Sequence, residues 1–266
     1  GPLTLNAAGE YRLLIVGDNA DTAATRSYTF EAQFQSNTPP APMSGTALTL
    51  NQSTTGSLDT SGEIDSFMFT LASDTTLYFD SLIDPMMNTF QWSLRGPAGT
   101  LVNNREFADQ NGGMETESNI FAAPAGQYEL KVKSWSGTGQ YDFAMIDLST
   151  SATALTLGTP VSPSPSLDPG NESHVYTFSA NAGDQLYLDV DSTSRAWRML
   201  NPWGVEMFGS SDEETITFSP QSGDRFFAAP YTGSYTLIVE GDDNSTSPTG
   251  YTLNIQPATT TTQTLS

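Results

Sequence analysis

The sequence predicts an all-β protein made of tandem antiparallel jelly-roll-type β-sandwiches, and three observations support this prediction. A motif that ends in Gly-x-Tyr occurs three times, with its glycine at Gly9, Gly126 and Gly233. Apolar and polar residues alternate in most of the segments that match between the copies. Turn-forming residues separate these segments every ~8–12 residues, which is the spacing expected in a sandwich. The last two glycines are 107 residues apart, so each repeat has the size of a domain rather than of a solenoid unit.

The boundaries of the repeats follow from segments that recur in the same order. Thr46–Leu50 returns as Thr153–Leu157, and Leu77–Asp80 returns as Leu186–Asp189. Each complete module is predicted to contain about seven or eight strands. The predicted organisation is the C-terminal half of a preceding module at 1–36, a proline-rich linker at 37–45, complete modules at 46–149 and 153–257, and the lead-in to a further module at 258–266.

The segments outside the complete modules are too short to form a module together. In the first half module, Leu13, Ile15, Tyr28 and Phe30 are spaced to bury one face. We expect these strands to pack against another chain or against other parts of a longer protein, because an isolated strand pair leaves a face and an edge exposed. The segment Ser149–Ser151 is so short that we expect the two complete modules to lie nearly end to end.

Individual strands are predicted from the alternation of apolar and polar residues. Ser66–Leu71 and Tyr128–Lys133 have apolar residues at every second position. Tyr235–Val239 and Tyr251–Ile255 are interpreted in the same way, as strands with one buried face. Only Ser118–Ala123 is ambiguous between strand and helix. The expected core consists of Phe67, Phe69, Tyr128, Leu130, Tyr141 and Phe143 in the first module and of Tyr176, Phe178, Tyr235, Leu237, Tyr251 and Leu253 in the second.

The chain is strongly acidic, with 30 acidic and 9 basic residues and a formal net charge of −21. Such a charge repels nucleic acids and anionic membrane surfaces. No apolar run reaches the ~20 residues of a membrane-spanning helix, so neither nucleic-acid binding nor membrane insertion is expected. The lack of cysteine excludes disulfides, thiolate metal sites and cysteine nucleophiles, and it leaves the redox compartment open. Loops rich in Ser, Thr, Asn and Gly, with little lysine, indicate an extracellular or cell-surface protein.

Several short motifs occur in an order that resembles a known family. They are Thr-Ala-Leu-Thr-Leu from Thr46, Gly-x-Leu-Asp ending at Asp59, Glu-Ile-Asp-Ser-Phe from Glu63, Phe-Ala-Ala-Pro-x-Gly-x-Tyr ending at Tyr128, and Gly-x-Tyr-x-Phe from Gly139. In both complete modules and in the half module, this order resembles the bacterial pre-peptidase C-terminal (PPC) domain. The resemblance implies a secreted jelly-roll sandwich attached to proteases and other exported proteins, sometimes calcium-binding, with the collagen-binding domains of clostridial collagenases among its relatives.

Calcium is the metal that the acidic clusters favour, because Ca²⁺ binds carboxylate and carbonyl oxygens. One cluster lies in a glycine-containing loop, one lies where the acidic residues of the PPC family fall, and one follows a predicted strand. His174 replaces Asp65 in the second module, so that module is expected to respond less to calcium at this strand. A turn rich in Asp and Asn remains the alternative for each cluster. The predicted metal ligands are Asp109, Asn111 and Glu115, then Asp59, Glu63 and Asp65, and finally Asp242, Asp243 and Asn244.

A catalytic site has little support in the sequence. Serine-type hydrolysis needs a base that a carboxylate orients, and the chain has one histidine, His174, close to Glu172. We interpret this histidine as structural or solvent-exposed. A carboxylate pair for glycoside cleavage remains open, although no pair stands out. We therefore expect no enzymatic activity.

Two of the four tryptophans are candidates for ligand binding. Trp92 and Trp197 occupy matched strand positions and are expected in the core. Trp135 and Trp203 lie in predicted turns and have no aromatic counterpart in the other module, and flat rings of this kind stack on sugars. Trp135 and Trp203 are the predicted ligand-binding residues.

These observations favour a non-catalytic repeat segment of a secreted or cell-surface bacterial protein that serves as a spacer, adhesion or assembly module stabilised by calcium. Its expected partners are neighbouring repeats or other copies of the chain. The alternative is an accessory module that tethers an exported enzyme to a polysaccharide or an extracellular matrix protein. A single groove lined by Trp135 and Trp203 would favour that alternative.

Overall fold

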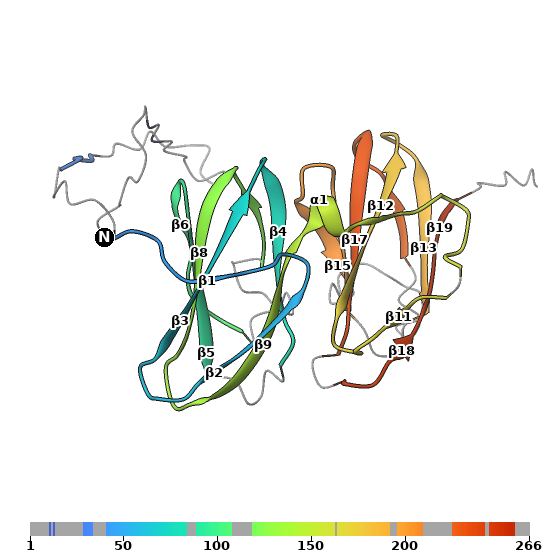
Figure 1. Cartoon of the computed structure of the whole chain (residues 1–266). Coiled ribbons are helices and arrows are strands. Elements are labelled where there is room, and N and C mark those ends of the chain that lie inside the picture. Colours follow the sequence, from blue (N-terminus) through green and yellow to red (C-terminus); the bar gives the residue numbers. More distant parts are fainter. Residues whose placement is uncertain are drawn as a thin grey trace, which may run out of the picture.

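The computed structural model contains two β-sandwiches that lie side by side and are joined by one short helix (Figure 1). This architecture confirms the predicted all-β fold class. The residues that the structure describes are 11, 13, 29–33, 41–83, 89–107, 119–162, 164–191, 196–209, 225–242 and 245–258.

The first sandwich consists of a five-stranded and a four-stranded sheet. In spatial order, the larger sheet contains β1 (Thr46–Ala47), β3 (Ile64–Leu71), β8 (Gly126–Ser134), β5 (Phe90–Gly96) and β6 (Gly99–Glu106). The smaller sheet contains β2 (Ser53–Leu58), β9 (Gly139–Asp147), β4 (Thr75–Ser81) and β7 (Ile120–Ala123). The ambiguous segment before Ala123 is therefore a strand.

The second sandwich repeats this topology. Its five-stranded sheet contains β10 (Thr153–Ala154), β12 (Ser173–Ala180), β17 (Gly233–Glu240), β14 (Ala196–Leu200) and β15 (Glu206–Gly209). The opposite layer contains β11 (Ser166–Leu167) paired with β18 (Thr249–Gly250), and β19 (Thr252–Pro257), β13 (Gln185–Asp191) and β16 (Arg225–Ala228). The ladders are antiparallel except at one edge of each larger sheet, where β1 pairs with β3 and β10 pairs with β12 in parallel.

All twelve residues of the predicted core are buried, with at most 8% of any of them exposed. The two matched tryptophans also lie in the cores. Trp92 stacks on Phe79 at a centroid distance of 4.0 Å, and Trp197 meets Phe208 edge to face at 5.9 Å. The inward alternation of the strands was thus predicted correctly.

The repeated Gly-x-Tyr motif makes the same hydrogen bond in both sandwiches. Tyr128 and Tyr235 each donate their hydroxyl to the backbone carbonyl four residues earlier, at 2.6 Å in both cases. Gly126 begins β8 with φ of +143°, and a Cβ there would lie 2.8 Å from Cγ of Pro97 in the β5–β6 turn. The motif therefore needs glycine for its backbone conformation and for close packing against that turn.

Two expectations are wrong, one about the arrangement of the modules and one about the faces of a strand. The modules do not lie end to end, because the sheet that contains β4 and β9 faces the sheet that contains β12 and β17 (Figure 1). The segment Tyr235–Val239 does not have one polar face, since the outward-facing Ile238 is fully buried. The connecting residues form a helical turn, α1 (Leu148–Ser151), which redirects the chain after β9.

The described residues before the first sandwich are few. Tyr11, Leu13 and residues 29–33 are not part of any strand, and Leu13 and Phe30 are 69% and 61% exposed. Ile15 and Tyr28, most of the predicted half module and nearly all of 258–266 lie outside the described residues. Within the described part of the chain, no helix is long and apolar enough to cross a membrane.

Candidate functional site at the junction of the two sandwiches

The outward faces of two sheets form an apolar junction between the sandwiches. The first sandwich contributes side chains from β4, β7 and β9 and from the residues that follow β4 and β9. The second contributes one side chain each from β12, β14 and β17. All are at most 8% exposed, and burial of each leucine, isoleucine or valine side chain stabilises a structure by roughly 1.5–3 kcal/mol. The junction residues are Tyr78, Leu82, Ile120, Ala144, Ile146 and Leu148 in the first sandwich and Val175, Leu200 and Ile238 in the second.

A buried polar network crosses this junction. Tyr78 Oη lies 3.0 Å from Glu240 Oε1 of the second sandwich and 3.1 Å from Asp80 Oδ1 of its own strand. Arg198 Nε lies 2.9 Å from the same Glu240 oxygen, and the guanidinium lies over the Tyr78 ring at 5.8 Å. None of the four residues is more than 5% exposed. The Tyr78–Glu240 hydrogen bond and the contact of Arg198 with the Tyr78 ring cross the junction, and the ion pair holds Glu240 in place for them.

The network contains fewer protons than its contacts need when both acids are ionised. A phenol has one proton, so Tyr78 donates to one carboxyl oxygen and can only accept from the other. Burial raises the pKa of Glu240, although Arg198 and Tyr78 act in the opposite direction. Burial also raises the pKa of Tyr78, with Asp80 adding to the effect, so the phenol stays protonated.

A cavity of about 310 Å³ lies beside this network, between the two sandwiches. Three carboxylates line it, those of Asp80, Asp142 and Glu172, together with apolar side chains that include Leu82 and Ile146. Burial raises the pKa of Asp142, while the hydroxyl of Ser53, which donates to Oδ1 at 3.0 Å, acts in the opposite direction.

Asn171 also lines the cavity and connects the two sandwiches. Its Nδ2 donates to the carbonyl oxygen of Leu82 at 2.8 Å. The residue is only 9% exposed, and its Oδ1 has no hydrogen-bond partner among the described residues.

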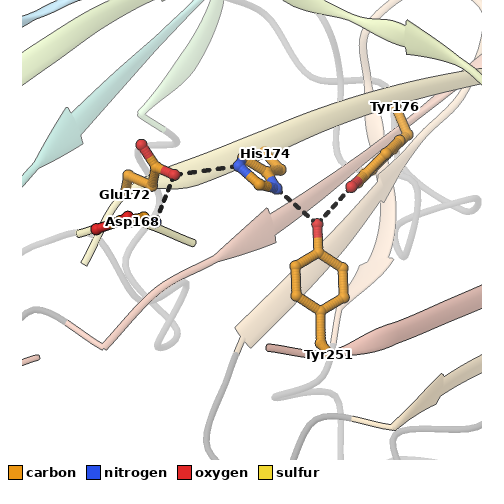
Figure 2. Close-up of polar contacts among 5 residues, drawn as sticks. All are labelled: Asp168, Glu172, His174, Tyr176 and Tyr251. Carbon is orange, nitrogen blue, oxygen red and sulfur yellow. Dashed lines mark hydrogen bonds and ion pairs between the residues drawn. The ribbon is translucent and has the colours of Figure 1, made fainter. Parts of the chain in front are cut away.

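His174 belongs to a second polar cluster, near the start of β12 (Figure 2). Its Nε2 lies 3.1 Å from Glu172 Oε1, and its Nδ1 lies 2.8 Å from the hydroxyl of Tyr251. That hydroxyl is 2.6 Å from the hydroxyl of Tyr176, and Glu172 also accepts from the backbone N–H of Asp168 at 2.7 Å. The order of groups is carboxylate, imidazole and hydroxyl, but the hydroxyl belongs to a residue that is 3% exposed. The cluster therefore offers no accessible nucleophile.

The matched cluster of the first sandwich explains why histidine is tolerated at this position. Asp65, which matches His174, accepts a hydrogen bond from Tyr141, which matches Tyr251. Glu63 accepts from the backbone N–H of Asp59 at 2.7 Å, as Glu172 does from Asp168. The exchange of aspartate for histidine therefore keeps the contact between this strand and the matched tyrosine.

The predicted calcium ligands are only partly described. Glu63 accepts three hydrogen bonds from its own turn, and Asp59 and Asp65 each accept one from a hydroxyl. Among the described residues, no three acidic, histidine or cysteine side chains are grouped so that they could hold a metal ion. Asp242 is described, whereas the other predicted ligands, Asp109, Asn111, Glu115, Asp243 and Asn244, lie outside the described residues.

Trp135 and Trp203 are 62% and 65% exposed, as expected for residues in turns. Trp135 follows β8 and Trp203 lies in the β14–β15 turn, and neither lines the cavity at the junction. Trp203 meets Tyr231, which is 44% exposed, edge to face at 4.5 Å. The structure thus pairs Trp203 with a tyrosine that the sequence did not single out.

The junction was not predicted from the sequence, although two strands carry a signal for it. Phe143–Ile146 is apolar at four consecutive positions, and so is Leu237–Val239 at three. Continuous apolar runs indicate strands that are buried on both faces, whereas alternation indicates one buried face. Tyr78, Arg198 and Glu240 gave no separate signal, because their partners come from distant parts of the chain.

No family model and no curated protein sequence matches the chain. Several solved structures resemble the chain at low identity and with low TM-scores. The pre-peptidase C-terminal domain of a collagenase from Bacillus anthracis is 20% identical, with 39% of this chain and 93% of that chain covered and a TM-score of 0.29. The periplasmic g-type lysozyme inhibitor PliG of Aeromonas hydrophila is 14% identical, with 40% and 94% covered and a TM-score of 0.31. The CUB1-EGF-CUB2 domain of human MASP-1/3 is 10% identical, with 78% and 100% covered and a TM-score of 0.25. At these values none of the three carries a functional conclusion for this chain.

Proposed function

We propose that this chain is a non-catalytic segment of an exported or cell-surface bacterial protein, and that its two sandwiches act as one rigid spacer. The observation that carries the proposal is the contact between Tyr78 and Glu240, which are 162 residues apart and form a hydrogen bond within a buried apolar junction. A spacer made of independent domains would not need to bury a charged network between them, because such burial is costly unless every group is paired.

The acidic surface is consistent with an exported segment. A net charge of −21 favours solubility. Calcium stabilisation is the part of this proposal that rests on the sequence alone, through the clusters around Asp109 and Asp243. Neighbouring repeats or other copies of the chain are the partners that a spacer of this kind would contact.

The rigidity of the spacer can be tested by NMR in a weakly aligning medium. Residual dipolar couplings from the two sandwiches should fit one alignment tensor and the orientation given by the structure. The Glu240→Ala variant, which removes the hydrogen bond to Tyr78 across the junction and the ion pair with Arg198, should give two different tensors. Two tensors in the unaltered protein would show independent modules and overturn the proposal.

A second candidate function is an accessory module that binds a polysaccharide or a matrix protein. It is favoured by the exposed pair of Trp203 and Tyr231, since adjacent aromatic rings can stack on sugars. Affinity electrophoresis in gels that contain polysaccharides, together with binding to immobilised collagen, tests this candidate. Retardation that is lost in Trp203→Ala and kept in Trp135→Ala would assign the binding to the pair. Equal mobility of all three proteins in every gel, without collagen binding, would exclude the candidate for the ligands tested.

A further inference from the structure

The junction shows how one face of the repeat is covered by a different face of the next repeat. The outer face of the sheet that contains β4 and β9 packs against the outer face of the sheet that contains β12 and β17 (Figure 1). Contacts between two different faces are heterologous. The pair of sandwiches therefore has one face of each kind outside the junction. We call the outer face of β3, β8 and β5 the head face and the outer face of β13, β16 and β19 the tail face.

The tail face keeps part of the pattern of the junction. Its outward residues are Tyr187, Asp189, Phe226, Asn254 and Gln256. The first two match Tyr78 and Asp80 of the junction in register. Phe226 is 66% exposed, and its ring lies 4.5 Å from the Tyr187 ring between centroids. Aromatic residues are enriched at interfaces between proteins, so this pair of rings indicates a surface for a partner.

The head face is basic at the positions that the junction uses in the other sandwich. Five of its residues match Val175, Arg198, Leu200, Ile238 and Glu240 in register. In that order they are Ser66, Ser93, Arg95, Lys131 and Lys133.

These basic residues concentrate positive charge in an acidic chain. The chain has two lysines, and both lie on the head face. Arg95 and Lys131 form ion pairs with Glu129 at 3.0 and 3.4 Å. Three basic residues and this one acid leave the group with a charge of +2, in a chain whose net charge is −21. The charge of the head face is therefore opposite to that of the molecule as a whole.

A second copy placed in the geometry of the junction brings the two faces together in register. Lys133 of one copy then takes the place of Glu240. It lies beside Tyr187 and Asp189 of the other copy. An ammonium group and a carboxylate meet there, whereas two carboxyl groups meet at Tyr78 in the junction. Complementary charges of this kind favour one partner and one register.

We propose that the tail face of one copy docks onto the head face of a second copy, so that copies of the chain associate head to tail. The inference rests on the proposed spacer function, because it names the surface through which the spacer contacts its own kind. Heterologous contacts build rows or rings rather than two-fold dimers. Polar residues at Lys131, Asn254 and Gln256 replace apolar ones of the junction, so the contact between copies is weaker than the junction and reversible.

Sedimentation equilibrium of the whole chain at about 0.15 M salt tests the association. At this ionic strength, charges more than about 8 Å apart are largely screened, so the general repulsion between acidic copies is reduced. We expect the weight-average mass to rise above that of the monomer as the protein concentration approaches about 1 mM, the range of weak complexes. A monomer at every concentration would overturn the proposal.

Two variants each remove one face. The head variant is Lys131→Glu/Lys133→Glu, and the tail variant is Phe226→Lys, which places an ammonium group against the two lysines. Each variant alone should associate at least about tenfold more weakly, because like charges then face each other. The tail variant makes the net charge less negative by one unit, so general repulsion cannot explain its loss of association. Association of either variant as strong as that of the unaltered chain would refute the contact.

An equimolar mixture of the two variants is the matched control. The head variant keeps an intact tail face, and the tail variant keeps an intact head face. A head-to-tail contact therefore predicts 1:1 complexes that form with the affinity of the unaltered chain and stop at the dimer. A contact between two identical faces, or non-specific adhesion, gives no such rescue. A mixture that stays monomeric would overturn the proposal.

Two further measurements separate the remaining outcomes. If a variant does not fold, concentration-dependent chemical shifts of the unaltered chain replace it. Shifts centred on the backbone amides of Lys133 and Phe226 support the contact, and shifts centred elsewhere reject it. A monomer whose head variant is also less stable would show that the head face is covered within the chain, on the side where the N–H of Ser44 donates to Glu129.

The dipolar couplings of the dilute protein test the spacer separately from this contact. One alignment tensor without association overturns the contact between copies and leaves the rigid spacer. Association of copies that show two tensors overturns the rigid spacer and leaves the contact.

Discussion

The sheet that contains β4 and β9 and the sheet that contains β13 and β19 have the same strand register. Their outer faces have different surroundings. In the first sandwich, Tyr78 on β4 lies opposite Ile146 on β9, and both are buried at the junction. In the second sandwich, Tyr187 on β13 lies opposite Gln256 on β19, and both remain partly exposed. The residue on the other neighbouring strand also differs. Tyr78 lies opposite Ile120 on β7, which is buried, whereas Tyr187 lies opposite Phe226 on β16, which is 66% exposed.

This difference shows how little sequence is needed to convert a solvent face into a junction. The β-strand register is unchanged, and Asp80 and Asp189 are kept at matched positions. Replacement of Ala144 and Ile146 by Asn254 and Gln256 turns a strand that is apolar on both faces into one that alternates. Two outward residues on one strand therefore mark which face of the repeat contacts its neighbour.

The largest effect on stability is expected from a charge placed on the junction face. Ile146→Asp buries a carboxylate without a basic partner and should lower the free energy of unfolding by at least ~3 kcal/mol. The matched Gln256→Asp lies on the exposed face and should change it by less than ~1 kcal/mol. Urea denaturation followed by far-UV circular dichroism measures both values. Equal destabilisation by the two variants would contradict the comparison of the two faces.

Removal of the hydroxyl from each of the two matched tyrosines should have different, smaller effects on stability. Tyr78→Phe removes the hydroxyl that contacts both Asp80 and Glu240, so it should cost about 1–3 kcal/mol because buried acceptors lose their partner. Tyr187→Phe should cost less than ~0.5 kcal/mol. Thermal unfolding of both variants under the same buffer conditions provides the measurement. A larger loss at Tyr187 would place the stronger hydroxyl contact on the exposed face and disprove this prediction.

The ends of the two matched strands should differ in their response to acid. Asp147 ends β9 and accepts from Thr75 at 2.6 Å and from the backbone N–H of Ser149 at 3.0 Å, whereas β19 ends at Pro257. Burial alone would raise the pKa of Asp147, but these hydrogen bonds outweigh it and hold the pKa below its ordinary value. Asp147→Ala should therefore cost about 1 kcal/mol at neutral pH, as the loss of a helix N-cap does.

The pH dependence of this cost has a definite sign. Because the pKa of Asp147 is lower in the folded state, its contribution is present above the unfolded-state pKa and is lost as the pH falls through the folded-state pKa. Asp142, with its raised pKa, behaves in the opposite way and contributes less as the pH rises through its folded-state pKa. Unfolding of Asp147→Ala and Asp142→Asn across the acidic range measures both. A cost of Asp147→Ala that grows in acid would refute the assignment.

The smallest effect on stability is expected from the addition of calcium. At a concentration equal to its dissociation constant, a ligand that binds only the folded state adds about 0.4 kcal/mol. Millimolar calcium should therefore raise the melting temperature by a few degrees, and more than magnesium does, because magnesium dehydrates reluctantly. Asp109→Ala should reduce this gain in the first module. Equal melting temperatures in chelator and in calcium, at constant ionic strength, would show that the acidic clusters are solvated surface.

The inner faces of the sheets could be predicted well from the sequence, because the alternation of apolar and polar residues along each strand indicates which face is buried. Phe67, Phe69 and Phe178 could be placed from local pattern alone. The junction depends on contacts between strands that are far apart in the chain, such as Tyr78 with Glu240. A local sequence pattern cannot indicate which distant residues will meet. The exposed positions of Trp135 and Trp203 followed from their turns, whereas the pairing of Trp203 with Tyr231 required the fold.

The helical turn between the sandwiches has a consequence for proteolysis. A protease binds an extended stretch of chain in its active-site cleft, so cleavage requires local unfolding of any ordered linker. In α1, Leu148 is buried at the junction, and the side chains of Ser149 and Ser151 bond back to Asp147. The connecting segment cannot be extended without opening the junction. Digestion of the folded protein should therefore spare the connection between the two sandwiches.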